Sequence, residues 1–222
     1  MHRPGAGRED YRRDPHTGEE AKAMRKIVAG LFMSLDGVVE APEKWTGPYF
    51  NDEIGQEIGS VLADGDTMLM GRKTYQTFAA SFAGQSGGMA DQMNHAPKLV
   101  VSTTLDAAEW QNSTLIKGNV ADELGRLKQQ PGQNINVSGS ITLIRSLLRD
   151  GLLDELRLQL FPVVVGSGMR LFANPGQQVS LKLAGSRTFG TGVVNLVYTP
   201  AGVAAPPSTA ASRTASPNGT RS

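Results

Sequence analysis

Cysteine is absent from this 222-residue chain, and histidine occurs only three times, at His2, His16 and His95. Without cysteine the protein has no disulfide bond, no thiol nucleophile, no iron–sulfur cluster and no Cys-ligated zinc. The three histidines lie far apart in the sequence, which argues against a histidine-based metal site. We therefore predict that the protein holds no metal.

Long apolar runs are missing as well. Each run is interrupted well short of the roughly 20 residues that a membrane span needs, and the N-terminus lacks the apolar stretch of a signal peptide. We therefore predict a cytoplasmic protein without a membrane partner. The chain has 22 Lys and Arg against 21 Asp and Glu, and residues 25–199 hold 15 of these bases and 16 of the acids. A domain so close to neutral has no general field for nucleic acid.

Both ends of the chain differ in composition from its middle. Residues 1–24 contain ten charged residues and no Ile, Leu, Val, Phe or Trp, and 19 of the 23 residues in 200–222 are Pro, Gly, Ala, Ser or Thr. Neither composition can build a hydrophobic core. We predict a disordered N-terminal extension (1–24), one globular domain (25–199) and a disordered tail (200–222), since the middle is long enough for a single core.

Short apolar runs alternate with helical patterns through the first two-thirds of this domain. The runs that predict strands are 26–33, 67–70, 98–101 and 134–137. Helices are expected to follow Asn51, Gly71 and Ser140, with Asn51 and Ser140 as N-terminal caps, and another helix is expected at 121–130. Such alternation is typical of a largely parallel sheet.

The last third of the domain has a different character. Leu156, Leu158 and Leu160 alternate with polar residues, as in a strand with one buried face, and further strands follow without helices. These strands predict an antiparallel extension of the same sheet, in which Pro162 marks a bulge or an exposed edge. The expected fold is a single three-layer α/β domain, with a mixed, mostly parallel central sheet and helices on both faces.

Small and hydroxyl residues stand at the carboxyl ends of four expected strands. These segments are 34–37, 71–74, 102–104 and 138–142. Ligands of open α/β sheets bind at this edge, where helix N-termini offer free N–H groups to anions. In the GRKT segment, Arg72 adds a guanidinium fork suited to phosphate, although an isolated GRKT equally fits a solvated helical turn. The segment 71–74 is thus a first candidate phosphate cradle, and 138–140 is a second one. Two such cradles in one cleft favour a dinucleotide.

Four segments carry a resemblance to a known family. They are SLDG (34–37), MGRKTY (70–75), SGSITL (138–143) and PVVVGSGMRLF (162–172). Their order resembles that of the dihydrofolate-reductase-like superfamily, and the chain is most similar to the reductase half of the bifunctional riboflavin-pathway deaminase-reductase. The zinc deaminase signature of that family requires cysteines, which this chain lacks. Val137 also stands where the family commonly has an acidic residue.

The resemblance implies an NADPH-dependent reductase that transfers hydride to a small heterocyclic, carbonyl or imine substrate, such as a pterin or 5-amino-6-(5-phosphoribosylamino)uracil. It implies cofactor contacts from Gly71, Arg72, Lys73, Thr74, Ser102, Thr103, Gly139, Ser140, Ile141 and Thr142. Arg72 is expected near the 2′-phosphate, and the nicotinamide beside the first strand and Val137. Because related reductase domains commonly pair, a homodimer is also expected.

The implied chemistry needs a proton as well as a hydride. Asp36 and Glu53 are the predicted catalytic acids. Asp36 fits a turn-forming role equally well, and Glu53 fits a residue that complements a helix dipole. Trp45, in the loop between them, is expected either to stack on a planar substrate or to hold its own loop in place.

Other functional classes find less support. The GQSGG segment at 84–88 fits the G-x-S-x-G pattern of hydrolases, but no strand is expected before it. The GSG and GTG segments at 166–168 and 190–192 lack the third glycine of a Rossmann dinucleotide motif. The remaining rival to a reductase is a non-catalytic NADP-binding or interaction module on the same fold.

Overall fold

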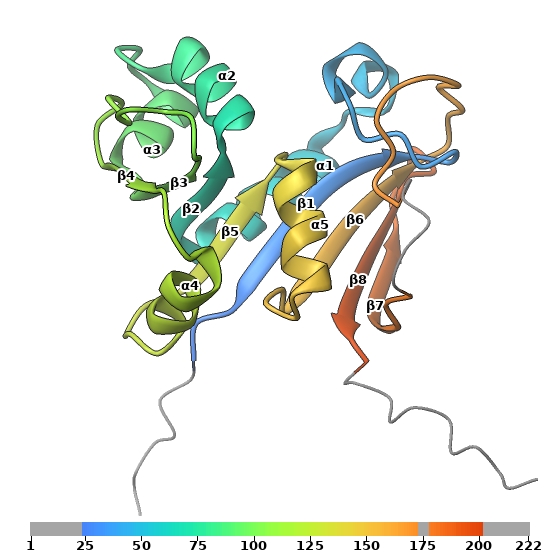
Figure 1. Cartoon of the computed structure of the whole chain (residues 1–222). Helices are drawn as coiled ribbons and strands as arrows, with labels where there is room; N and C mark the ends of the chain where they lie inside the picture. Colours follow the sequence, from blue (N-terminus) through green and yellow to red (C-terminus); the bar gives the residue numbers. More distant parts are fainter. Residues whose placement is uncertain (1–23, 173–177, 202–222) are drawn as a thin grey trace, which may run out of the picture.

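The computed structural model describes residues 24–172 and 178–201, so nearly all of the expected N-terminal extension and tail lies outside the described residues. Within these ranges the strands form one eight-stranded sheet in the order β4-β3-β2-β5-β1-β6-β8-β7 (Figure 1). The strands are β1 (Ile27–Ser34), β2 (Gly65–Gly71), β3 (Lys98–Val101), β4 (Ser113–Ile116), β5 (Asn134–Ser138), β6 (Glu155–Phe161), β7 (Leu181–Thr188) and β8 (Val194–Pro200).

Helices cover both faces of this sheet, as predicted. Their bounds are α1 (Asp52–Ala63), α2 (Arg72–Phe82), α3 (Gly88–His95), α4 (Val120–Lys128) and α5 (Ile141–Arg149), with short 3-10 turns η1 (Pro42–Lys44) and η2 (Gly47–Tyr49). Strands β1 to β6 pair in parallel, whereas β8 runs antiparallel to β6, and β7 antiparallel to β8. The predicted fold class is therefore confirmed. No helix in the described part of the chain is both long and apolar enough to cross a membrane.

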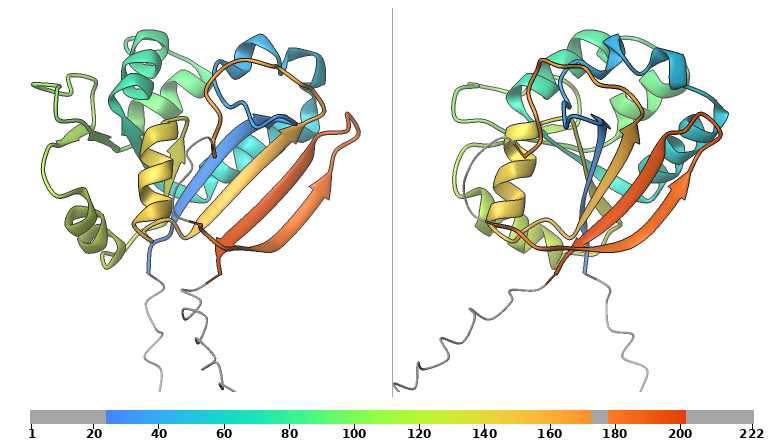
Figure 2. Two further views of the ribbon diagram at one scale, coloured as in Figure 1. Left: turned by 45° about the vertical axis from the view of Figure 1, so that its right-hand side comes forward. Right: turned by 90° about the vertical axis from the view of Figure 1, so that its right-hand side faces the viewer.

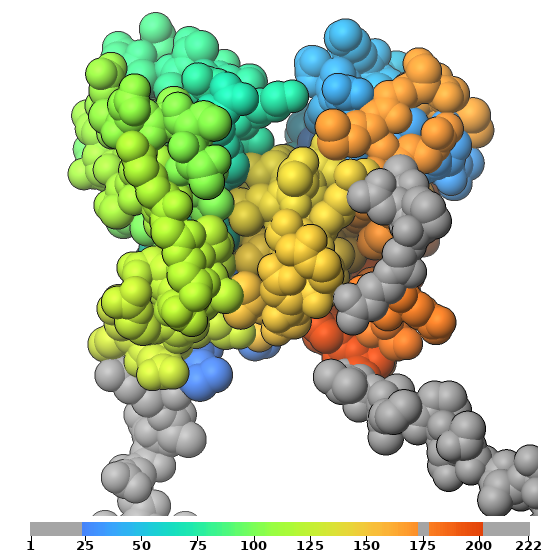
Figure 3. Space-filling view, viewed as in Figure 1, coloured from blue at the N-terminus to red at the C-terminus, as the bar shows by residue number. Residues whose placement is uncertain are grey.

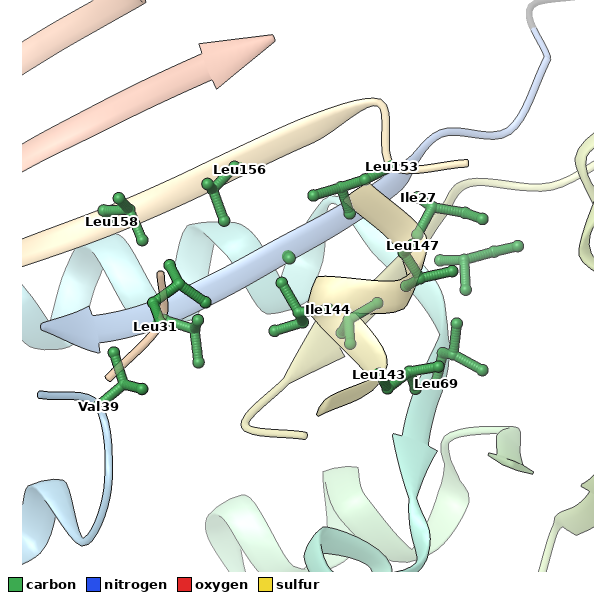
Figure 4. Close-up of a cluster of buried hydrophobic side chains, with 14 of the residues drawn as sticks. Ile27, Leu31, Val39, Leu69, Leu143, Ile144, Leu147, Leu153, Leu156 and Leu158 are labelled. Carbon is green, nitrogen blue, oxygen red and sulfur yellow. The ribbon is translucent and has the colours of Figure 1, made fainter. Parts of the chain in front are cut away.

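The front face of the sheet, which α4 and α5 cover, carries the largest apolar core. Leu143, Ile144 and Leu147 of α5 pack on Ala29 and Leu31 of β1 and on neighbouring strands (Figure 4). Because side chains alternate across a strand, the residues between these in β1 point to the back face. The packing of α5 thus determines which side chains of β1 point to the front face and which to the back face.

The back face holds two smaller apolar clusters on either side of the sheet centre. One joins Met68 and Met70 of β2 to Tyr75 of α2 and Met93 of α3. The other gathers around Phe161 and includes Ile54 of α1 with residues of the β7–β8 turn. Between the two clusters the back face is covered by fewer apolar side chains.

Helix α1 crosses this back face and packs Ile54 and Ile58 on one apolar cluster and Leu62 on the other. Asn51 caps it as predicted, accepting a hydrogen bond from the Ile54 N–H at 3.1 Å, and Ile54 is its single buried residue. Polar bonds complete the attachment: Asn136 Nδ2 donates to the Val61 carbonyl at 2.8 Å, and Asn195 Nδ2 donates to Glu57 Oε1 at 2.9 Å. The helix is therefore held to the sheet by these hydrogen bonds together with the packing of Ile54, Ile58 and Leu62.

Two elements escape the sequence patterns, and one expectation is wrong. The four-residue β4 and the glycine-rich start of α3 are too short and too polar to show a clear period. Pro162 marks neither a bulge nor an edge, because β6 ends at Phe161 and lies between β1 and β8. The exposed edge on that side is β7, since β8 inserts between β6 and β7 (Figure 2).

A lysine is buried beside α3 without a carboxylate partner among the described residues. Lys98 opens β3 and is 1% exposed. Its Nζ donates to the carbonyls of Ala96 at 2.7 Å, Gln111 at 3.0 Å and Asn94 at 3.3 Å, and lies 4.3 Å from the centre of the Trp110 ring. Burial lowers the pKa of Lys98 from 10.5 to about 8.

We expect this lysine to make the protein more stable as the pH rises from about 8 to 10.5. In that interval the unfolded chain binds the Lys98 proton more than the folded chain does, so the free energy of unfolding increases by up to about 1.4 kcal/mol per pH unit. Denaturant unfolding at pH 7 to 10.5 should show this rise in the parent and not in Lys98→Met. The exposed Lys44→Met is the control, and equal pH dependence of Lys98→Met and the parent would contradict the expectation.

Candidate active site

The carboxyl ends of β2 and β5 lie side by side, because these strands are neighbours and run in parallel. Helices α2 and α5 begin directly after them. In the space-filling view a deep notch opens at this end of the sheet, above α5 (Figure 3). One of its walls contains α2, and the other contains the loops 35–50 and 162–172. The notch is therefore where ligands of this kind of sheet bind.

The two predicted phosphate cradles contact one another directly. The Gly71 N–H donates to Ser140 Oγ at 2.8 Å, and both the N–H and the hydroxyl of Ser140 donate to Thr74 Oγ1 at 2.9 Å. Ser140 Oγ is thus occupied as donor and acceptor. Thr74 Oγ1 accepts twice, so its own hydrogen remains for a ligand.

The backbone of the second cradle takes two left-handed residues in succession. Gly139 has φ +62°, and Ser140 has φ +47°. A Cβ on Gly139 would lie 3.2 Å from both Oγ1 and Cγ2 of Thr74, so glycine is needed there both for conformation and for space. The expectation that Ser140 caps α5 is wrong, because its hydroxyl turns back to Thr74 and makes no cap bond.

Helices α2 and α5 begin differently from α1 and α4. In α1 and α4 an asparagine side chain caps the first turn and two acidic residues follow. Neither α2 nor α5 has a side-chain cap or an acidic residue in its first turn. Their first N–H groups are left available at the notch, which is the arrangement that binds an anion.

The basic residues of the first cradle are exposed. Arg72 bonds only to Gln76 Oε1, at 3.3 Å, in the described part of the chain, and Lys73 is also exposed. At the end of β3, Ser102 is buried and its hydroxyl accepts from the N–H groups of Thr104 and Leu105. Ser102 therefore shapes the turn, and the exposed Thr103 is the side chain that a ligand can reach.

Asp36 fastens together the two loops of the opposite wall. It accepts from the Ser34 hydroxyl at 2.7 Å and from the N–H groups of Val165 and Gly166 at 3.0 and 2.9 Å. These bonds, the one from Ser34 foremost, hold the pKa of Asp36 well below its usual range. Arg170 Nη2 lies 3.4 Å from the same carboxylate. An aspartate held ionised in this way is a poor proton donor.

Glu53 makes comparable contacts at a different place. Its carboxylate accepts from the Gly190 N–H at 2.7 Å and from Asn51 Nδ2 at 3.2 Å. The bond from Gly190, then that from Asn51, lowers the pKa of Glu53, and Arg187 lies 3.4 Å away. Glu53 therefore ties the start of α1 to the β7–β8 turn, and the structure does not join it to Asp36 in one cluster.

The two predicted substrate contacts lie in packed surroundings. Trp45 meets Phe161 edge-on, with ring centroids 5.5 Å apart, and its indole N–H donates to the Glu40 carbonyl at 3.1 Å. The side chain of Val137 is 1% exposed and packs in the front core. Trp45 thus holds its own loop, and Val137 can reach a ligand only through its backbone.

Gly30, which the sequence analysis did not single out, lies in the middle of β1, next to the end of β5. It pairs with Ser138 of β5 and Arg157 of β6, and a Cβ placed on it would meet no atom within 4 Å. A glycine inside an apolar strand marks a close approach of another group. Its place in the apolar run 26–33 was therefore the signal that could have identified it.

We expect Gly139→Ala to destabilise the cradle. The alanine must adopt the left-handed conformation and push on Thr74, which costs about 1–3 kcal/mol. Gly118→Ala is a matched control, since its Cβ would meet nothing within 4 Å and its φ is not positive. Urea unfolding of both variants checks the difference. A Gly139→Ala variant as stable as Gly118→Ala would show that the cradle relaxes freely.

Known proteins resemble this chain in sequence or in fold. The chain is 31% identical over 182 residues to the uncharacterized protein YyaP of Bacillus subtilis (strain 168), covering 78% of this chain and 94% of YyaP. A pyrimidine reductase-like protein from Corynebacterium diphtheriae superposes with a TM-score of 0.59 at 11% identity, covering 79% of this chain and 92% of that one. Dihydrofolate reductase from Enterococcus faecalis, complexed with NADP(H), gives 0.54 at 13% identity, with coverages of 79% and 96%.

These structural likenesses confirm the dihydrofolate-reductase-like fold that the sequence motifs implied. The family assignment comes from the sequence itself. The profile of the RibD C-terminal domain matches residues 25–195, which is essentially the whole described domain. The chain therefore belongs to the RibD C-terminal domain family.

Proposed function

We propose that this protein is an NADPH-dependent reductase that transfers hydride to a small heterocyclic, carbonyl or imine substrate. The observation that carries the proposal is the pair of uncapped helix N-termini, α2 and α5, joined through Thr74 and Ser140 at one notch. Two anion-binding helix ends in contact suit the linked phosphates of a dinucleotide. Membership of a reductase-domain family supports the same conclusion.

The chain's own groups fit the phosphates of such a cofactor. The free hydrogen of Thr74 and the N–H groups at the start of α5, from Ile141 and Thr142, can donate to the pyrophosphate. Gly71 and Gly139 leave room for the backbone to approach it. Arg72 and Lys73, without a carboxylate partner in the described residues, suit the 2′-phosphate. Ser102 and Thr103 then lie toward the adenine ribose.

The reacting ring belongs at Gly30. When bound, the cofactor supplies the hydride from its nicotinamide, and the bare backbone at Gly30, which pairs with Ser138, lets a flat ring lie against the sheet. In this proposal Asp36 and Glu53 are ionised and have structural roles: Asp36 joins the two loops that form one wall of the notch, and Glu53 joins the start of α1 to the β7–β8 turn. In this proposal the proton that follows the hydride comes from water in the open notch.

We further propose that the protein is a homodimer in the cytoplasm. The edge strand β7 is largely exposed, with Leu183 at 49%, and offers unpaired backbone groups to a second copy. Light scattering distinguishes a monomer of 23.6 kDa from a particle of twice that mass. A monomeric mass would remove this part of the proposal and leave the reductase unaffected.

The decisive experiment is to incubate the protein with NADPH and a panel of pterins, aminouracils and small carbonyl compounds. Loss of the nicotinamide absorbance with at least one substrate supports the reductase. NADPH binding without oxidation across the panel supports the rival, a non-catalytic NADP-binding module. Absence of NADPH binding overturns both. Asp36→Asn and Glu53→Gln should retain turnover with the reactive substrate. Loss of turnover in either variant would instead support the catalytic acid role that the sequence predicted for that residue.

We expect Arg72→Ala to abolish a preference for NADPH over NADH. A charge-assisted pair with the 2′-phosphate contributes about 1.5–3 kcal/mol, or roughly ten- to a hundredfold in affinity. Fluorescence titration with both cofactors measures it, and NADH binding should stay nearly unchanged in the variant. The exposed Arg149→Ala, paired with Asp150 far from the notch, is the control. Equal affinities of the parent for NADPH and NADH would contradict the assignment.

A further inference from the structure

Helix α5 contacts both walls of the notch. At its start, the N–H and the hydroxyl of Ser140 donate to Thr74 Oγ1 of the α2 wall. On the next turn, Arg145 Nε donates to the Leu171 carbonyl at 2.9 Å, and Arg145 Nη2 donates to the Arg170 carbonyl. Both carbonyls belong to the loop 162–172 of the opposite wall (Figure 3). The cradle and this wall therefore share one helix as their support.

The opposite wall is a pair of loops that bond to one another. At the end next to β1 and β6, the Leu35 N–H donates to the Val163 carbonyl at 2.9 Å. At the other end, the Val39 N–H donates to the Met169 carbonyl, also at 2.9 Å. The near end thus continues directly from two strands of the sheet, whereas the far end, around Val39 and Met169, depends on other contacts.

Two contacts hold the far end on α5. One is apolar, because Val39 and Leu171 are buried in the front core together with the leucine-rich face of α5. The other is the guanidinium of Arg145, whose planar fork meets two successive carbonyls. An apolar side chain can turn within its contact, but a fork with two bonds fixes the direction of the backbone. Arg145 therefore determines how the far end is oriented on the helix.

The neighbouring Arg170 makes different contacts. Its Nε donates to the Asp36 carbonyl at 2.9 Å, and its Nη2 lies 3.4 Å from the Asp36 carboxylate. Arg170 thus ties one loop to the other, and Arg145 ties both loops to α5. In the described part of the chain the Arg145 guanidinium forms no ion pair with a carboxylate, so its donors remain committed to the two carbonyls.

We propose that Arg145 is a positioning residue of the notch: it fixes the wall of loops 35–50 and 162–172 at the place, relative to the cradle, that the substrate requires. This inference rests on the proposed reductase function. A substrate in the notch lies between the cofactor and this wall, and a wall that must first be ordered weakens substrate binding. The bonds within the cradle do not involve Arg145, so cofactor binding should not depend on it.

Hydrogen exchange measured by NMR tests the hold of Arg145 on the wall. Arg145→Met keeps most of the side-chain stem and removes both bonds, so the far-end amides should exchange at least about tenfold faster than in the parent. The near-end amides and those of α5 should stay within about twofold of the parent, because the sheet and the front core support them. The far-end amides are those of Val39, Met169 and Leu171, and the near-end amides are those of Leu35 and Val165.

Arg149→Met is the matched control. Arg149 lies one turn further along α5, is exposed and pairs with Asp150, so its loss should leave all these amides unchanged. Far-end exchange in Arg145→Met that equals that of the control would overturn the proposal. Faster exchange throughout the domain would show a general loss of stability and would overturn it as well. Arg145→Gln serves if Arg145→Met does not fold.

Enzyme kinetics separate positioning from a purely structural role. In Arg145→Met the Kd of NADPH should stay within about twofold of the parent. The KM of the panel compound that the parent reduces fastest should rise about tenfold, with little change in kcat. Arg145→Lys should give an intermediate KM, since an ammonium group can reach one carbonyl but lacks the fork. An unchanged KM, or an NADPH Kd that rises as much as the KM, would overturn the proposal.

Failure of the proposed function gives a different result. If the parent oxidises NADPH with no compound of the panel, the reductase assignment fails. The exchange comparison then still decides whether Arg145 holds the wall.

Discussion

Three hydrogen bonds around Thr74 and Ser140 join residues that are 66 to 69 positions apart in the chain. They bring the first turn of α2 against the turn that starts α5, and so lock the carboxyl ends of β2 and β5 into one edge. The left-handed backbone at Gly139 and Ser140 turns the chain so that Ser140 meets Thr74. Without it, the N-termini of α2 and α5 would not be joined by side-chain hydrogen bonds.

A few polar groups also hold together the opposite wall of the notch. Two carboxylates, Asp36 and Glu40, receive the backbone N–H groups of the loop 162–172, and Arg145 of α5 reaches the Leu171 carbonyl at 2.9 Å. Loops that lack a core of their own are thus positioned by hydrogen bonds to strand ends and to a packed helix. Such a wall is preformed, which reduces the cost of ordering it around a ligand.

Most of the architecture could be predicted, because its signals are local. The apolar run of β1, the Asn51 cap and the leucine-rich face of α5 each indicate their element from a few neighbouring residues. The short β4 and the helix α3 could not be predicted, since the pairing of β4 with β3 and the Asn94 network stabilise them from distant parts of the chain. For the site, the cradle segments were visible as strand-end motifs. The bonds of Asp36 and Glu53 to residues more than 120 positions away were not visible, and those bonds, together with the local ones from Ser34 and Asn51, lower the pKa of both groups.

Ile54 is the single fully buried residue of α1, and the other residues of this helix are partly or fully exposed. Regions with few buried apolar contacts open locally at a lower free energy than the whole domain. The helix can therefore detach from the sheet by breaking its bonds from Asn136 and Asn195 and by exposing Ile54, while the α5 core stays intact. Its backbone amides should then exchange with solvent ahead of those of α5.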